Sequence, residues 1–258
     1  MLLPRILSAL VLAPLALAAV WFGAASFAVL AAVAGVVAAW EWTRLCLGRF
    51  GPGGWVLALM TVVVTILGPH FPLAAVAGFL WAAVTAPLVQ RSAGRSPLWM
   101  AGGAFYIGLP LLALVWVREL DRATLLWLLL IIWSTDIGAY IAGRLIGGPK
   151  LMPRVSPKKT WAGLVGGVAS AGLVGAAVAD YLLVNPWPLA AVSMALGVVA
   201  QGGDLAESWV KRYFGVKDSS GIIPGHGGVL DRLDGLLATA PVVAATCLAF
   251  QGGLTEWR

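Results

Sequence analysis

Residues that could do chemistry gather in one stretch near the end of the chain, SWVKRYFGVKDSSGIIPGHGGVLDRLD, from Ser208 to Asp234. It holds four of the 17 lysines and arginines, three of the 11 aspartates and glutamates and one of the two histidines. Five glycines and a proline between Gly215 and Gly228 indicate backbone that turns sharply and approaches a partner closely. Mixed charges on such a backbone predict a site for an anion and a metal ion.

Carboxylates for the metal come from Asp204, just before this stretch, and from Asp231 and Asp234 within it. Carboxylates that meet in surroundings of low dielectric repel one another, so a bound cation is the natural compensation. Ligand sets made of oxygen alone suit Mg²⁺. We therefore predict these three aspartates as magnesium ligands. A purely structural loop is the alternative.

Basic side chains in the same stretch would stabilise a polyanion beside the ion; they are Lys211, Arg212, Lys217 and Arg232. His226 lies among small residues that leave its backbone free to approach a ligand, namely Gly225, Gly227 and Gly228. Two roles stay open for the His226 ring: a general acid, or a hydrogen bond to a phosphate or a base.

Two clusters lie outside this stretch. Ser156-Pro157-Lys158-Lys159-Thr160 places hydroxyls and positive charges at the start of an expected helix, where free backbone N–H groups also favour phosphate. The alternative is that these basic residues only mark a cytoplasmic loop. Asp136 lies inside an apolar segment, where an unpaired carboxylate is costly, so it either serves a functional cavity or pairs with Arg144.

The elements that position these residues are membrane helices, because 60% of the 258 residues are hydrophobic and only 11% are charged. This composition predicts an all-α fold, a polytopic helical bundle. A span needs about 20 apolar residues, and fewer inside a bundle. On that measure we expect nine spans, at 6–22, 25–45, 55–67, 73–89, 98–117, 123–145, 161–184, 188–207 and 236–250. The third and the ninth are short, which leaves a count of eight open.

Basic residues set the expected orientation, because Lys and Arg resist translocation. A cytoplasmic N-terminus puts 14 of the 17 basic residues, including Arg91 and Arg95, on the cytoplasmic side. The three on the other side are Arg118, Arg122 and Arg258. We expect one membrane-embedded unit, in which residues 1–122 form N-terminal helices and residues 123–258 form the catalytic helices with their cytoplasmic loops.

Several familiar sites are absent from the sequence. There is no HExxH zinc motif, no GxSxG elbow and no P-loop. The net charge of +6 follows the membrane topology and does not indicate a nucleic-acid partner.

The charged stretch resembles the signature of the phosphatidate cytidylyltransferase family, also called CDP-diacylglycerol synthases. The matching pattern is Ser208-x-x-Lys211-Arg212, followed by Lys217-Asp218-x-x-Gly221-x-Ile223-Pro224-Gly225-His226-Gly227-Gly228-x-x-Asp231-Arg232-x-Asp234. Supporting matches are Asp136-x-Gly138-Ala139-Tyr140, Ser156-Pro157-Lys158-Lys159-Thr160-Trp161 and Gly203-Asp204-Leu205-x-Glu207-Ser208. Ala162 departs from the pattern, since many members carry Glu or Gln there.

The resemblance implies an activity: condensation of CTP with phosphatidic acid to give CDP-diacylglycerol and pyrophosphate. It implies Mg²⁺ as cofactor, a monovalent cation such as K⁺ in some members, and a homodimer in the bacterial inner membrane with its active site facing the cytoplasm. Asp204 and Asp231 would be the metal-holding pair, with Asp234 and Asp218 nearby.

The expected catalytic residues are Asp204, Lys217, His226, Asp231 and Arg232. The expected substrate-binding residues are Asp136, Ser156, Lys158, Lys159, Thr160, Ser208, Lys211, Arg212, Asp218, Gly225, Gly227 and Gly228. Two other functions stay open: the same transfer onto a different lipid phosphate, and a membrane transporter, which Asp136 and the Gly-rich helices would suit.

Overall fold

Long apolar helices make up most of the molecule in the computed structural model, which describes residues 3–90 and 96–257. Arg91, Arg95 and Arg258 lie outside the described residues. Within the described part, seven helical segments are long and apolar enough to cross a membrane. They are α2 (Ala24–Leu47), α4 (Pro72–Val89), the segment Trp99–Leu120, α7 (Arg122–Leu145), α8 (Trp161–Tyr181), α9 (Pro186–Tyr213) and the segment Leu230–Glu256 that contains α10 (Leu230–Ala249) and η2 (Leu254–Glu256). The chain is therefore an integral membrane protein.

Two shorter apolar helices accompany these seven. They are α3 (Pro52–Ile66) and the part of α1 (Leu3–Phe22) from Leu10 to Phe22. All nine segments expected from the sequence are thus helical. A count of nine spans stays a prediction, because α3 and the Leu10–Phe22 part of α1 are each shorter than a full crossing requires.

The span at Trp99–Leu120 is interrupted by a wider turn. It consists of α5 (Trp99–Gly103), the π-helical turn η1 (Ala104–Gly108) and α6 (Leu109–Leu120). Pro110 has no N–H to give to the carbonyl four residues earlier, so the regular helical ladder is broken here. The break falls at Tyr106, whose hydroxyl enters the polar site described below.

The described residues form a nearly all-α fold, as expected, with one short exception. Strands β1 (Lys150–Met152) and β2 (Ser156–Thr160) form an antiparallel hairpin in which Lys150 pairs with Thr160. Pro153 and Pro157 disfavour helix in this segment, so it stays extended until Thr160. The Thr160 hydroxyl then accepts from Gly163 N at 3.0 Å and caps α8.

The loop within the charged stretch is also shorter than expected, because the helices on both sides extend into it. The eighth span was expected to end at residue 207 and the ninth to begin at 236, yet α9 continues to Tyr213 and α10 begins at Leu230. Asp231 and Asp234 consequently lie in the first turns of α10. The helices extend because their polar residues find partners inside the protein, a compensation that hydropathy along the chain does not reveal.

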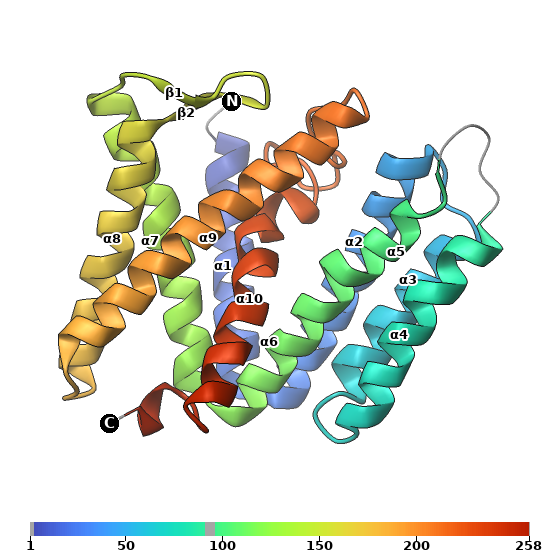
Figure 1. The fold of residues 1–258 in the computed structure, drawn as a ribbon, viewed down its shortest axis with the longest axis horizontal. Helices are drawn as coiled ribbons and strands as arrows, with labels where there is room; N and C mark the ends of the chain where they lie inside the picture. Colours follow the sequence, from blue (N-terminus) through green and yellow to red (C-terminus); the bar gives the residue numbers. More distant parts are fainter. Residues whose placement is uncertain (1–2, 91–95, 258) are drawn as a thin grey trace.

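Small residues bring the C-terminal helices together. A Cβ on Gly166 of α8 would collide with Ala142 of α7, and one on Gly203 of α9 would collide with Ala238 of α10. Close backbone approach of this kind holds helices together where lipid already solvates apolar side chains. The glycines of α8 therefore allow it to pack closely against α7. Figure 1 shows α9 crossing in front of the bundle beside α8 and α10.

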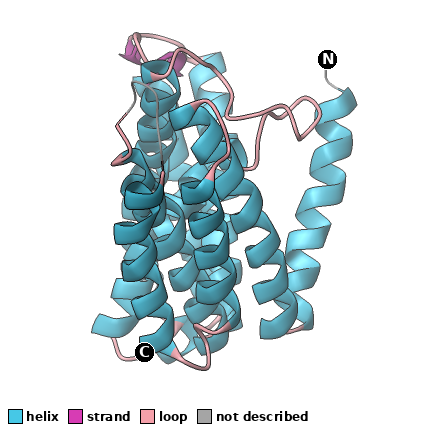
Figure 2. Ribbon diagram, turned by 90° about the vertical axis from the view of Figure 1, so that its right-hand side faces the viewer, coloured by secondary structure: helices cyan, strands magenta, loops and turns pink. Residues whose placement is uncertain are grey.

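One end of the bundle carries the polar elements. The hairpin and the loop between α9 and α10 both lie there, and α1 begins at that end while α10 finishes at the opposite one (Figures 1 and 2). This arrangement brings the two clusters of predicted site residues to a single face of the molecule.

Candidate active site

The facing surfaces of α9 and α10 carry a row of polar side chains. Asp204, Glu207 and Lys211 project from α9, and Asp231 and Asp234 belong to α10. The two helices come close because Gly203 has no side chain: a Cβ there would lie 2.8 Å from Asp234 O. Residues far apart in the sequence are thereby gathered into one polar layer.

Lys211 is the centre of this layer. Its ammonium forms ion pairs with Glu207 Oε1, at 3.1 Å, and with Asp231 Oδ1. The exposed fractions of the three side chains are 9% for Lys211, 1% for Glu207 and 6% for Asp231. Tyr106 OH donates to Glu207 Oε2 at 3.2 Å, so the N-terminal helices contribute to the same network. Charges so deeply buried must be compensated inside the protein, by one another and by hydrogen-bond donors.

Asp231 is also the anchor of the loop. Its Oδ2 accepts from Ser219 N at 2.8 Å, from Ser219 Oγ at 2.8 Å and from Gly228 N at 2.7 Å. Gly227 lies beside it with φ of +82°, and a Cβ there would come within 2.6 Å of Asp231 Oδ2. Gly227 is therefore required because the backbone passes tightly around this carboxylate.

Asp204 has a more open setting. Lys159 Nζ, from β2, lies 2.6 Å from Asp204 Oδ2, and Ser208 Oγ donates to Oδ1 at 3.2 Å. The exposed fraction of the Asp204 side chain is 36%. Asp136 and Asp234 both lie within electrostatic reach of Asp204. The structure thus brings the Lys158-Lys159 cluster and the intramembrane aspartate to the same place as the α9 carboxylates.

Asp136 does not use the partner considered for it. The Arg144 guanidinium donates to Tyr140 OH at 2.7 Å. Asp136 instead interacts electrostatically with Asp204, Lys159 and Arg232. Of the two readings left open by the sequence, the arrangement favours a place in the polar layer over pairing with Arg144.

The geometry of the described residues does not test the metal assignment. Within residues 3–90 and 96–257, no three or more His, Cys, Asp or Glu side chains are already grouped around an ion position. The donor chemistry nevertheless suits Mg²⁺, because the layer offers carboxylate and hydroxyl oxygens. Two of its carboxylates, Asp204 and Asp231, face lysine ammonium groups. Magnesium binding by Asp204, Asp231 and Asp234 stays a prediction.

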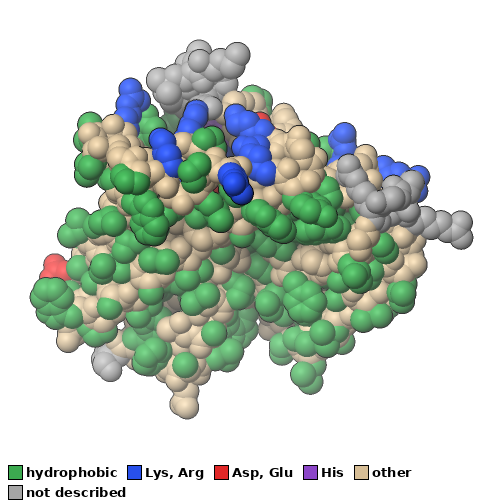
Figure 3. Space-filling view, turned by 45° about the horizontal axis from the view of Figure 1, so that its top comes forward, with side chains coloured by type: hydrophobic (Ala, Val, Ile, Leu, Met, Phe, Trp, Pro, Cys, Tyr) green, Lys and Arg blue, Asp and Glu red, His purple; other side chains and the backbone are tan. Residues whose placement is uncertain are grey.

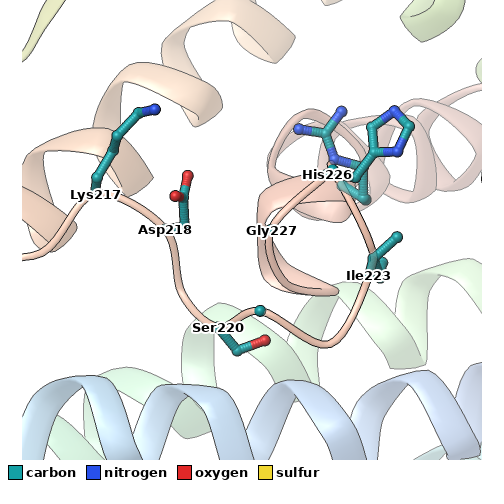
Figure 4. A pocket seen from close by; sticks show the side chains of 9 residues that line it. Lys217, Asp218, Ser220, Ile223, His226 and Gly227 are labelled. Atoms are coloured by element: carbon teal, nitrogen blue, oxygen red, sulfur yellow. The ribbon is translucent and has the colours of Figure 1, made fainter. Parts of the chain in front are cut away.

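A pocket of about 490 Å³ opens in the loop beside this layer. Its size is within the range of about 300–1,000 Å³ that small-molecule sites occupy. The lining includes Lys217, Asp218, Gly225, His226, Gly227 and Arg232, all of them predicted site residues. Figure 4 shows the loop running as an open bend, with Lys217 and Asp218 on one arm and His226 on the other.

Basic side chains surround this end of the molecule. Figure 3 shows lysines and arginines gathered over its upper face, above a largely hydrophobic body. Lys158, Lys217 and Arg232 are exposed, as a polyanion site requires. Arg212 is exposed too, but its guanidinium donates to Val155 O at 3.3 Å and Val216 O at 2.8 Å, so it ties the hairpin to the end of α9. Thr160 has its hydroxyl engaged as the α8 cap.

Sequence reasoning missed two serines of the loop, Ser219 and Ser220, and three residues that the N-terminal helices bring to this site. Glu41 of α2 and Tyr106 of η1 enter the polar layer, and Ser8 of α1 forms a hydrogen bond with His226 Nδ1. One signal was available: Glu41 is a lone carboxylate inside an expected span, the feature that had drawn notice to Asp136. Tyr106 and Ser8 carry no such signal.

The chain is similar to known proteins over almost its entire length. A family model described as the Cytidylyltransferase family matches residues 3–250. The phosphatidate cytidylyltransferases of Brucella suis biovar 1 and Brucella melitensis biotype 1 are each 42% identical over 249 residues, covering 93% of this chain and 90% of each relative. The phosphatidate cytidylyltransferase of Rickettsia felis is 44% identical over 145 residues, covering 53% of this chain and 64% of that protein. A match of this extent includes both the polar layer and the helices that build it, and the chain belongs to the cytidylyltransferase family.

Proposed function

We propose that this chain transfers CMP from CTP to phosphatidic acid, giving CDP-diacylglycerol and pyrophosphate. The observation that carries the proposal is the identity of 42% with relatives named phosphatidate cytidylyltransferase, over 93% of the chain. The pocket beside the polar layer supports it, since exposed Lys217 and Arg232 offer positive charge to a triphosphate.

The reaction has modest chemical demands. A phosphate oxygen of phosphatidic acid forms a bond to the α-phosphorus of CTP, and the bond from that phosphorus to the oxygen bridging to the β-phosphate breaks, so that pyrophosphate leaves. The attacking oxygen is already anionic, so little proton removal is needed. The barrier is mainly repulsion between anions and the alignment of the two substrates. Fixed positive charges and a preformed pocket address both.

The basic residues and the histidine of the site would contact different parts of the substrates, according to where each lies. Lys217 and Arg232 line the pocket, where they would hold the phosphates of CTP. Lys159, on β2, forms an ion pair with Asp204 of α9, where it would meet a phosphate that approaches along α9. His226, held by Ser8, would contact the nucleotide from the other arm of the loop.

Magnesium is part of the proposal, with Asp204, Asp231 and Asp234 as its oxygen ligands. When bound, the ion supplies charge neutralisation at the phosphates. Lys159 and Lys211 compensate two of these carboxylates in the structure described here, which supports their assignment as a place for positive charge. A monovalent cation such as K⁺ would belong to the same region.

One substrate lies in the lipid and the other in the cytosol, so the site must face the cytoplasmic surface of the membrane. We assign the basic end of the bundle to the cytoplasmic face of a bacterial inner membrane, with the N-terminus cytoplasmic, nine spans and a homodimeric assembly. The start of α1, the hairpin and the pocket loop share that end, which supports this orientation (Figure 1).

A direct test uses the purified full chain in detergent, CTP labelled at the α-phosphorus, phosphatidic acid and Mg²⁺. We expect labelled CDP-diacylglycerol, and no label in lipid without Mg²⁺. An isoprenoid ether lipid phosphate serves as competitor. Preferential labelling of that competitor would show that it, and not phosphatidic acid, is the substrate. Solute flux in proteoliposomes without any CTP turnover would instead favour a transporter.

A further inference from the structure

Glu41 is the least expected member of the site. It lies on α2, far from the charged stretch in sequence, and its exposed fraction is 0%. Its carboxylate accepts hydrogen bonds from Ser220 Oγ at 2.6 Å, Val229 N at 2.9 Å and Leu230 N at 2.8 Å, and a longer one from Ser219 Oγ at 3.2 Å. Within residues 3–90 and 96–257 no ion pair of Glu41 with a Lys or Arg is described, and a buried carboxylate of that kind is stabilised by several donors that converge on it.

These donors come from both ends of the pocket loop. Ser219 and Ser220 precede the Gly-rich turn, while Val229 and Leu230 follow it and begin α10. The two amides are among those that a helix leaves without partners at its N-terminus, where a negative charge is also favoured by the helix dipole. Glu41 therefore closes the loop and caps α10 at once.

The space around this contact is filled. A Cβ on Gly228 would collide with Ser219 Oγ and with Glu41 Oε1. Ser219 also donates to Asp231 Oδ2, so the two carboxylates share one serine. A displacement of Glu41 would be transmitted directly to the backbone that carries the pocket.

We propose that Glu41 is a positioning residue, which fixes the loop from Ser219 to Leu230 so that the pocket is formed before its anionic ligand arrives. It contacts no reacting atom and acts through Ser220, which lines the pocket, and through the start of α10, which carries Arg232. The N-terminal helices thereby contribute to ligand affinity. The identification of the ligand as CTP rests on the proposed function, whereas the loop anchoring does not.

The test compares the full-length Glu41→Gln variant with the wild-type chain in detergent. Glutamine keeps the size of the side chain but turns an NH₂ group toward donors, so at least one of the loop contacts is lost. Hydrogen exchange of the backbone amides at 219–230 is expected to quicken by about tenfold or more, because a hydrogen bond to a charged group is lost. The Michaelis constant for CTP is expected to rise by a similar factor, with a smaller change in kcat.

Two further variants make the result specific. Thr43→Val is the matched control on α2. The Thr43 hydroxyl is buried and donates to Ala39 O at 2.7 Å and to Met100 Sδ at 4.0 Å, neither of which belongs to the pocket loop, so exchange at 219–230 should stay at the wild-type rate. Ser220→Ala removes one partner of Glu41, and its effect should be smaller in the Glu41→Gln background than in the wild type.

Exchange at 219–230 that is unchanged in folded Glu41→Gln protein, or additive effects of the Glu41 and Ser220 changes, would overturn the proposal. If Glu41→Gln does not fold, faster exchange in Ser220→Ala supports the anchoring and wild-type exchange there rejects it. The exchange measurement needs no substrate, so a wild-type chain that lacks CTP turnover would reject the proposed function while still testing Glu41.

Discussion

Replacing Lys211 with methionine tests the central ion network of the site. The ammonium of Lys211 lies against Glu207 and Asp231, and the three side chains are only 9%, 1% and 6% exposed. Methionine fills most of the space of the lysine stem, so the change removes the charge with little loss of packing. Two buried carboxylates would then face each other without a cation.

The expected cost is large for one substitution. Breaking a buried ion pair by removing one partner destabilises a protein by about 3–5 kcal/mol. Tyr106 still donates to Glu207, and Ser219 and Gly228 still donate to Asp231, so the hydrogen bonds that remain limit the loss. We therefore expect the free energy of unfolding to fall by about 3 kcal/mol, near the lower end of that range.

Unfolding in mixed micelles with a rising fraction of SDS, followed by circular dichroism, measures this free energy. Lys217→Met provides the matched control, since Lys217 is exposed in the pocket loop and forms no ion pair with a carboxylate in the described part of the chain. A surface change of that kind should alter the free energy of unfolding by no more than about 0.5 kcal/mol. Equal unfolding midpoints for the Lys211→Met and Lys217→Met chains would refute the reasoning, because the carboxylates would then not depend on Lys211.

Other substitutions probe the helix contact, the metal assignment and the distal cap. Gly203→Ala drives α9 from α10 and should slow CMP transfer by about a hundredfold, while Gly202→Ala, which meets open space, should leave the rate unchanged. Asp204→Asn should lower Mg²⁺-dependent turnover by about a hundredfold, in contrast to Asp180→Asn at the far end of α8; equal rates would reject Asp204 as a ligand. Asp121→Ala removes the cap that accepts from Ala123 N at 3.0 Å, and should cost about 1–2 kcal/mol in SDS unfolding without altering the Michaelis constant for CTP.

Hydropathy along the sequence did not predict the hairpin or the true ends of α9 and α10. The fall in hydropathy placed the end of the eighth expected span at residue 207 and the start of the ninth at residue 236, so residues 208–213 and 230–235 were expected in a loop. The charges are tolerated in helices for two reasons. Lys211 and Glu207 pair one turn apart. Glu41 accepts from the amides of Val229 and Leu230 at the start of α10, and Asp231 accepts from the loop amide of Gly228. Such partners are known only once the chain is folded.

The sequence by itself determined the membrane bundle, the family and the identity of most polar residues at the candidate site. Apolar segment length, basic loops and a glycine-rich charged signature are local properties, and each can be read along the chain. The tertiary structure decided which carboxylate meets which cation: Lys159 for Asp204, and Lys211 for both Glu207 and Asp231. It also assigned Glu41 to the pocket loop, since only packing brings α2 against the start of α10. Contacts between distant segments depend on helix packing, which no local pattern specifies.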